Sequence, residues 1–319
     1  MKKVLSLLFL ILFLTTSISA TTWYFWRYRT HDNDCTNLTN TQDEDLCYQK
    51  NEQDLYVYDS GKWKPISPVG CIDASVYDNL DEAISDIGST EKTLLISKDI
   101  SVSADLTVPE NITLKFTYPA KITVPNGVTL TINGRIDAGL WQIFSGDGTV
   151  TGSPKIEAVY PEWFGAKGDG VADDSGVMQK ASALNRVLYL SDKTYLLLNS
   201  VSVVGIKGVR SDLSILKLQN NGKIVLEGGD DGYFTMFEDL GINAETTNSN
   251  IVEVKRRRIN AKRFRIAGTA NNNQVGFFFD VSFSAQTFHH FSDFTICDVD
   301  YVFKVEGSQW FNANYIGDM

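Results

Sequence analysis

The sequence predicts an all-β fold: a parallel β-helix, or solenoid, that starts with short capping helices and follows a small β module. Three kinds of repeat predict it. A helix followed by a strand occurs twice, with equivalent residues at a constant spacing. A turn-and-strand segment is repeated once, and an apolar-x-isoleucine pair recurs in the last third of the chain. Such repeats indicate coils that bury their apolar faces only against neighbouring coils.

The repeats have definite spacings. Ala83 and Ile87 of the first helix lie 94 residues before Val177 and Ala181 of the second. The segment 108–114 resembles the segment 124–130, which lies 16 residues further on. The apolar-x-isoleucine pairs are Leu240/Ile242, Phe264/Ile266 and Phe294/Ile296. A sandwich of short strands is the alternative fold, and the two helix-to-strand starts favour the solenoid.

Residues 1–20 predict a secretory signal peptide. Lys2 and Lys3 form a basic start, an apolar run follows from Val4 to Leu14, and small residues lead to Ala20. The apolar run is shorter than the roughly 20 residues of a membrane span. We therefore expect a secreted, periplasmic or cell-surface protein, with an uncleaved N-terminal anchor as the alternative.

The chain is acidic, with 29 Lys+Arg, 39 Asp+Glu and a net charge of −10. Such a surface repels nucleic acid and anionic membranes, so neither is an expected partner. None of the four cysteines forms a CxxC pair, and an exported chain allows disulfides. The short polar segment between Cys35 and Cys47 makes them the favoured pair, although four cysteines allow three complete pairings.

Residues 21–72 form the predicted β module. Alternation over 54–59, a turn at Ser60-Gly61 and a return over 62–64 predict a β-hairpin. The module is interpreted either as a spacer or as a binding element.

Residues 73–160 form a first predicted β-helix segment. Leu80, Ala83, Ile84 and Ile87 have helical spacing, with Asp78 or Asn79 as the N-cap and Gly88 at the end. A strand is expected over 93–97.

The second helix-to-strand copy begins in a glycine- and aspartate-rich segment that runs from Trp163 to Asp174. Val177, Ala181 and Leu184 share one helical face, which predicts a helix over 175–184. Asp174 is the expected N-cap, because its carboxylate can accept a bond from a free N–H of the first turn. A strand is expected over 187–190.

The run from Tyr160 to Ala181 resembles the start of the β-helix in the pectate-lyase-like superfamily. The resemblance covers about 73–319, with 161–319 as the pectate-lyase-like domain, and it implies a right-handed parallel β-helix. Members include pectate lyases, rhamnogalacturonases, uronan epimerases and phage tail-spike depolymerases, and some relatives are not enzymes. One departure is Gly176, where the family more often has a helix former such as alanine. Since fold alone does not fix chemistry, the resemblance leaves the catalytic residues unknown.

Gly168, Asp169, Gly170, Asp173 and Asp174 admit two interpretations. Glycoside hydrolysis uses two carboxyl groups that flank one bond. Carboxylates at a helix start instead satisfy free N–H groups and the positive helix end. The second interpretation, a structural cap motif, is favoured, because in the resembled family this motif lies outside the active clefts. A further pair, Asp230-Asp231, lies between glycines and is interpreted as a turn.

Lys255, Arg257, Arg263 and Arg265 belong to a basic stretch in an acidic chain. Alternate residues of a strand share a face, so Lys255 and Arg257 are expected to project together. A lyase acting on a uronate needs cations that neutralise the carboxylate and a base that takes the C5 proton. These four residues are the candidates for binding an anionic glycan. The alternative is a solvated face paired with nearby acids.

His289-His290 lies beside Asp293 and suggests a metal or acid–base site. Adjacent residues of a strand point to opposite faces, so the two histidines are not expected to share one ion. One of them is expected in a stack of side chains instead. The residues predict no metal site and no cofactor, and Ca²⁺ is implied only by the resemblance.

Strand patterns over 301–305 and 310–316 continue to the end of the chain, and no closing element follows them. An uncovered last coil leaves strand edges unpaired. We therefore expect either a longer protein of which this is the N-terminal part, or a trimer or partner that covers the edge. Trp310, Phe311 and Tyr315 suit either sugar stacking or the core of that coil.

The predicted function is that of an exported lyase or hydrolase of an acidic extracellular polysaccharide. The alternative is a non-catalytic glycan-binding adhesin, or a tail-spike-like receptor-binding protein.

Overall fold

The computed structural model describes residues 28–31, 46–49, 54–59, 62–65, 71–227, 235–246, 248–255, 258–269, 273–280, 286–307 and 311–316. The chain divides into two compact units, Met1–Ile66 and Ser67–Met319. Each unit is described by itself. In the part of the chain that the structure covers, no helix combines the length and the apolar character that a membrane crossing requires.

The first unit contains one four-stranded sheet. Its strands, in spatial order, are β1 (Tyr28–His31), β2 (Leu46–Gln49), β3 (Asp54–Asp59) and β4 (Lys62–Pro65). β3 and β4 pair antiparallel with Tyr58 opposite Trp63, which confirms the predicted hairpin. β2 pairs antiparallel with β3, and β1 pairs parallel with β2, so the sheet is larger than the hairpin alone.

Cys47 on β2 is buried and disulfide-bonded. Cys71 and Cys297, in the second unit, are free thiols. Cys35 lies outside the described residues, so its pairing with Cys47 stays a prediction.

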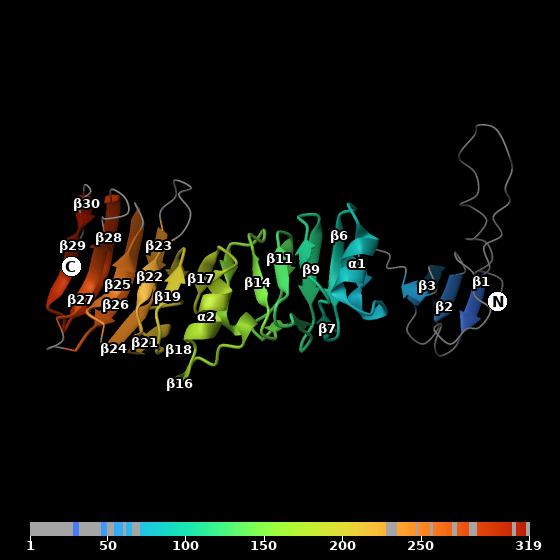
Figure 1. Cartoon of the computed structure of the whole chain (residues 1–319), viewed down its shortest axis with the longest axis horizontal. Helices are drawn as coiled ribbons and strands as arrows, with labels where there is room; N and C mark the ends of the chain where they lie inside the picture. The colour runs from blue at the N-terminus through green and yellow to red at the C-terminus, as the bar shows by residue number, and fades with distance from the viewer. Residues whose placement is uncertain are drawn as a thin grey trace. The chain divides into compact units, whose positions relative to one another are not determined.

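The second unit is a parallel β-solenoid of about nine turns, which confirms the predicted fold. Its coils follow one another in chain order from β6 to β30 (Figure 1). It begins with β5 (Cys71–Asp73), the 3₁₀-helix η2 (Ala74–Val76) and helix α1 (Leu80–Ile87). β5 pairs with β6, so the solenoid starts before residue 73.

Helix α1 has the predicted caps. Of the two candidates for the N-cap, Asn79 fills the position, and its side chain accepts a hydrogen bond from the N–H of Glu82. Gly88 ends the helix with a positive φ of 58°. Leu80, Ala83, Ile84 and Ile87 are buried, so the predicted face closes the start of the core.

The first coils form three parallel sheets. One continues from β5 through β6 (Lys92–Ile96), β9 (Ile112–Phe116) and β12 (Arg135–Asp137). The second contains β7 (Ile100–Ser101), β10 (Ile122–Thr123) and β13 (Phe144–Ser145). The third contains β8 (Leu106–Val108), β11 (Thr129–Ile132) and β14 (Thr149–Gly152).

The later coils form two larger sheets. An eleven-stranded sheet contains β15 (Ala158–Val159), β16 (Asp169–Asp173), β17 (Val187–Tyr189), β18 (Thr194–Leu197), β20 (Ile206–Lys207), β21 (Ile215–Asn220), β23 (Thr235–Glu238), β24 (Gly241–Thr246), β26 (Ile259–Ala267), β28 (Gln286–Cys297) and β30 (Phe311–Ile316). A five-stranded sheet contains β19 (Val201–Val203), β22 (Ile224–Leu226), β25 (Asn250–Val254), β27 (Val275–Asp280) and β29 (Tyr301–Glu306). Along the chain, the 3₁₀-helix η3 (Pro161–Phe164) follows β15, and helix α2 (Ser175–Ser182) follows β16.

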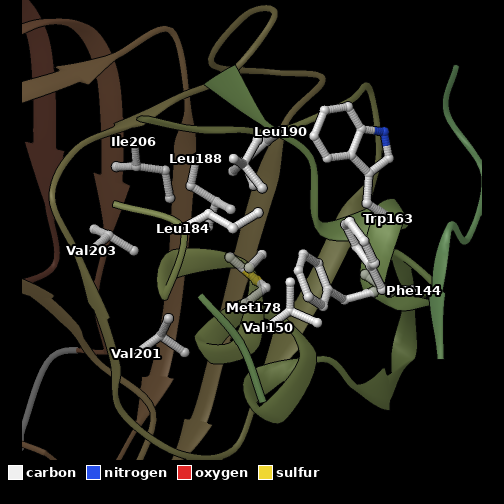
Figure 2. Packing of buried hydrophobic residues seen from close by; sticks show 14 of the residues in the cluster. Phe144, Val150, Trp163, Met178, Leu184, Leu188, Leu190, Val201, Val203 and Ile206 are labelled. Carbon is white, nitrogen blue, oxygen red and sulfur yellow. The ribbon is translucent and has the colours of Figure 1, made fainter. Parts of the chain in front are cut away.

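Two predictions about helix α2 need correction. The helix ends at Ser182, so Leu184 lies beyond it, although Leu184 is buried as expected. Met178, not Val177, is the fully buried residue of the first turns, and Val177 is only half-buried. Figure 2 shows Met178 among Val150, Leu184 and Leu188, where the helix covers the interior between the two groups of coils.

The coil register confirms one sequence repeat and corrects another. Ile242 pairs with Ile266, and Ile266 pairs with Ile296, so the isoleucine repeat does mark successive coils. The repeat with a spacing of 16 residues does not correspond to one coil. Segment 108–114 joins β8 to β9, whereas segment 124–130 joins β10 to β11, so the two are similar corners at different places on the cross-section. Both corners need the same Val-Pro turn into a strand, which explains the likeness.

Phenylalanine side chains fill the core of the last coils. Phe277 is fully buried and makes ring contacts with Phe237, Phe264 and Phe291 at centroid distances of 5.1 to 5.5 Å. Phe264 and Phe294 stack at 5.2 Å and 3°. Aromatic pairs of this geometry stabilise a core beyond the area that they bury.

The two adjacent histidines of β28 point to opposite sides, as predicted. His289 is buried against the ring of Phe279, with 4.9 Å between ring centroids. His290 is half-buried, and its Nδ1 lies 3.0 Å from Oδ1 of Asn260. Burial lowers the pKa of His289 to about 4.

The low pKa of His289 makes stability depend on pH. Above pH 6.5 the imidazole is neutral in both the folded and unfolded states, and below that pH the unfolded chain binds the proton more readily. We expect the solenoid to lose about 2 kcal/mol between pH 6.5 and pH 5, measured by urea unfolding. His289→Phe should remove this loss and His290→Gln should retain it. An unchanged pH dependence in His289→Phe would contradict the assignment.

Candidate functional site

The carboxylates of the cap motif accept hydrogen bonds from backbone N–H groups. Asp169 accepts the N–H groups of Val171 and Ala172, both at 2.8 Å. These bonds lower the pKa of Asp169. Gly168 and Gly170 have positive φ angles of 59° and 70°, which a glycine adopts without strain.

Asp174 occupies the N-cap position of α2, but the predicted hydrogen bond between its side chain and the first turn of the helix is wrong. Its carboxylate accepts the N–H groups of Lys167 and Gly168, at 2.8 and 3.0 Å, and makes no bond to the first turn of the helix. Asp173 takes that role and accepts the N–H and hydroxyl of Ser175. Burial raises the pKa of Asp174. Burial also acts to raise the pKa of Asp173, but the hydrogen bonds from Ser175 and from the N–H of Leu198 together outweigh it and lower that pKa. The motif therefore ties the loop 167–174 to the helix start.

The basic candidates lie on different faces of the solenoid. Lys255 follows β25 of the five-stranded sheet and forms ion pairs with Glu227 and Glu253, at 3.6 and 3.4 Å. Arg263 and Arg265 lie on β26 of the eleven-stranded sheet. Arg257 and the Asp230-Asp231 pair lie outside the described residues. Of the three candidates that the structure describes, Arg263 and Arg265 lie together.

Arg263 and Arg265 line a groove of about 490 Å³ at one corner of the last coils. Arg263 has a positive φ of 52° and forms a two-pronged ion pair with Asp239, at 2.6 and 2.8 Å, on the preceding coil. Asp293 lines the same groove from the next coil. Arg263 therefore has carboxylate partners already, and Arg265 is the more available cation of this corner.

A larger groove of about 770 Å³ lies where the first sheet ends and the eleven-stranded sheet begins; we call it the aromatic groove. Its polar lining consists of Arg135, Asp137, Lys155, Glu157 and Arg186. Its apolar and aromatic lining consists of Ile136, Ala138, Ile156, Ala158, Tyr160, Trp163 and Tyr189. These residues come from β12, β15 and β17 with their flanking residues, and from η3.

Three aromatic rings form one side of the aromatic groove. Tyr160 lies 5.4 Å from Trp163 and 5.9 Å from Tyr189, measured between ring centroids. The buried indole of Trp163 donates its Nε1–H to the carbonyl of Gly139 at 2.8 Å, which fixes the ring. Nζ of Lys207 lies over the ring of Tyr189 at 5.6 Å. Burial, and then the neighbouring Tyr189 and Glu162, raise the pKa of Tyr160, so its hydroxyl stays neutral.

The charges of the aromatic groove are not all paired. Asp137 lies 3.6 Å from Lys115, and Lys155 lies 2.9 Å from Glu110. Arg186 donates to the carbonyls of Ser153 and Pro154, which holds the segment before β15. Among the described residues, neither Arg135 nor Arg186 forms an ion pair with a carboxylate. The groove therefore offers free guanidinium charge on an acidic protein.

A buried carboxylate, Glu162, lies in η3 between two residues that line the groove. Its Oε1 accepts the hydroxyls of Tyr195 and Ser191 at 2.6 and 2.7 Å, and Nζ of Lys193 lies 3.3 Å away. Its Oε2 is buried with no hydrogen-bond partner among the described residues. Burial, together with the bond to Glu162, raises the pKa of Tyr195 well above its ordinary value, so this hydroxyl remains a donor. The cluster anchors η3 to the next coil.

The described residues contain no group of three or more His, Cys, Asp or Glu side chains placed to hold a metal ion. Comparison with family models, with curated proteins and with solved structures finds no match to this chain.

The sequence predicted only part of this site. Tyr160, Glu162 and Trp163 stand in the segment that carried the family resemblance, but no role was predicted for them. No sequence pattern predicted a role for Arg135, because it lies in the groove only as a result of how the coils align, and that alignment cannot be read from the sequence. The predicted candidates Arg263 and Arg265 do share a groove, on later coils.

Proposed function

We propose that this chain is an exported β-helix protein that binds an acidic extracellular polysaccharide in the aromatic groove. One observation carries the proposal: a solvent-open groove combines tyrosine rings with arginines that have no carboxylate partner among the described residues. Apolar ring faces match the C–H faces of sugars, and a few placed polar groups fix the ligand's orientation. A guanidinium recognises a uronate carboxylate through two parallel hydrogen bonds.

We also propose membership of the pectate-lyase-like superfamily. The parallel β-helix, the glycine-aspartate loop that leads into α2 and the strand that follows the helix support this assignment. Export is part of the proposal and rests on the signal-peptide pattern of residues 1–20.

The test is binding of the purified chain to polygalacturonate and alginate, with neutral dextran for comparison, by calorimetry. We expect Arg135→Gln to weaken binding of the acidic polymers about tenfold, because it removes charge-assisted hydrogen bonds. Arg210→Gln is the matched control, since Arg210 is an exposed arginine that already pairs with Asp212. Equal binding of dextran, or an Arg135→Gln variant that binds like the parent, would overturn the proposal.

A second candidate is cleavage of the bound glycan. Asp137 and Glu157 both line the groove, and the N–H of Lys155 donates to the carbonyl of Gly134, beside the start of β12. Glycosidases use a pair of such carboxyl groups that flank the bond to be cleaved. Release of reducing ends would support hydrolysis, and a near-ultraviolet chromophore would support β-elimination. Binding without either product leaves glycan recognition as the function.

A further inference from the structure

One corner of the solenoid carries an exposed aromatic patch. Tyr118 follows β9 and is 76% exposed, Leu140 follows β12 and is 57% exposed, and Trp141 is half-buried beside them. The rings of Tyr118 and Trp141 meet edge to face at a centroid distance of 5.7 Å. Large apolar side chains grouped on a surface in this way indicate a binding site.

The patch continues the aromatic groove along the coils. Tyr118, Trp141 and Trp163 are 23 and 22 residues apart, close to the 22 residues that separate the paired residues Thr113 and Arg135. The rings of Tyr118 and Trp141 are in contact, and the indole of Trp163 bonds to Gly139, which lies against the ring of Trp141. We call these three aromatic residues the aromatic row. Trp163 lines the groove, so the row begins inside it.

Backbone bonds between coils hold the row in place. The indole of Trp141 donates to the carbonyl of Ala120 at 3.4 Å, and that of Trp163 donates to Gly139 at 2.8 Å. The N–H of Ile143 donates to the carbonyl of Trp163 at 3.0 Å. Gly139 lies directly under the indole of Trp141, because a Cβ at this position would lie 2.3 Å from its ring carbon Cζ3. The rings are thus positioned before any ligand binds.

We infer that the aromatic row is an extended binding site for the same polysaccharide, which runs along the coils from the aromatic groove to Tyr118. The inference rests on the proposed function. Coils lie about 4.8 Å apart, a distance comparable to the length of one sugar unit. The charges near Tyr118 are those of Lys121 and Asp99, which face each other at 3.8 Å. Tyr118 and Trp141 therefore bind sugar faces through apolar contact, and Arg135 of the groove binds a carboxylate.

The test compares a short acidic oligomer with a long polymer, each titrated into the whole chain. Tyr118→Ala should weaken binding of the long polymer about fivefold and leave the short oligomer unchanged, because a short ligand fills the groove alone. Tyr301→Ala is the matched control, since Tyr301 is an exposed tyrosine on β29.

The outcomes separate the two proposals. If Arg135→Gln weakens both ligands while Tyr118→Ala weakens neither, the groove binds glycan and the extended site is wrong. If no acidic glycan binds the parent chain, both proposals fail. If Tyr118→Ala changes the sedimentation coefficient instead, the row is a contact between copies of the chain, and the inference is overturned.

Discussion

Replacing Gly134 with alanine is expected to destabilise the β-solenoid by at least about 3 kcal/mol, because the new methyl group would overlap backbone atoms that have no room to move. A Cβ at residue 134 would lie 2.0 Å from the carbonyl oxygen of Ile112 and 2.7 Å from that of Pro109. Gly134 also accepts the N–H of Lys155 from the next coil. Relief of the overlap would therefore separate three coils at the edge of the aromatic groove.

Urea unfolding followed by circular dichroism measures this effect. Gly176→Ala is the control, since a Cβ at that position meets nothing within 4 Å and the residue is exposed in helix α2. Alanine there is expected to stabilise the helix by up to about 1 kcal/mol. If Gly134→Ala unfolds at the same urea concentration as the parent chain, the coil packing described above is wrong.

Replacing Glu162 with alanine is expected to cost about 3 kcal/mol. The buried hydroxyls of Tyr195 and Ser191 would lose their shared acceptor, and an unpaired buried donor costs about 1–3 kcal/mol. Loss of the ion pair with Lys193 adds less to this cost, because the side chain of Lys193 is 38% exposed and water can solvate its ammonium group. The same substitution should weaken glycan binding, since Glu162 lies between the groove residues 160 and 163.

Two further variants identify the cause of the effect. Glu162→Gln keeps an oxygen acceptor for both hydroxyls and should lose less stability than Glu162→Ala. Tyr195→Phe removes one donor and should cost about 1 kcal/mol. Equal losses in Glu162→Gln and Glu162→Ala would show that charge, and not the hydrogen bonds, stabilises the cluster.

Local patterns were sufficient to predict the class of fold. Helix α1 and its caps follow from Asn79, Gly88 and four apolar residues on one face, all within one short segment. The isoleucines at 242, 266 and 296 align in the coils as predicted. Equivalent residues of a solenoid repeat because every coil must bury an inward face, and such repetition is visible in one sequence.

Local patterns failed where two neighbours compete for one role. Both Asp173 and Asp174 are suitable N-cap residues, and the sequence favoured Asp174 because it directly precedes the helix. In the structure Asp174 is buried under residues 167 and 168 and accepts their N–H groups, which leaves Asp173 to bind Ser175. The path of the loop 167–174 decides which aspartate binds the helix start, and that path depends on contacts with the next coil.

The sequence by itself determined the solenoid, its capping helices and the hairpin of the first unit, because each depends on residues close together in the chain. Only the tertiary structure decided the aromatic groove. Coil length varies from the 18 residues between Leu188 and Ile206 to the 31 between Ile206 and Phe237, as corners lengthen. Since Arg135 meets Tyr160 and Tyr189 only through this variable register, no spacing in the sequence identifies them as neighbours.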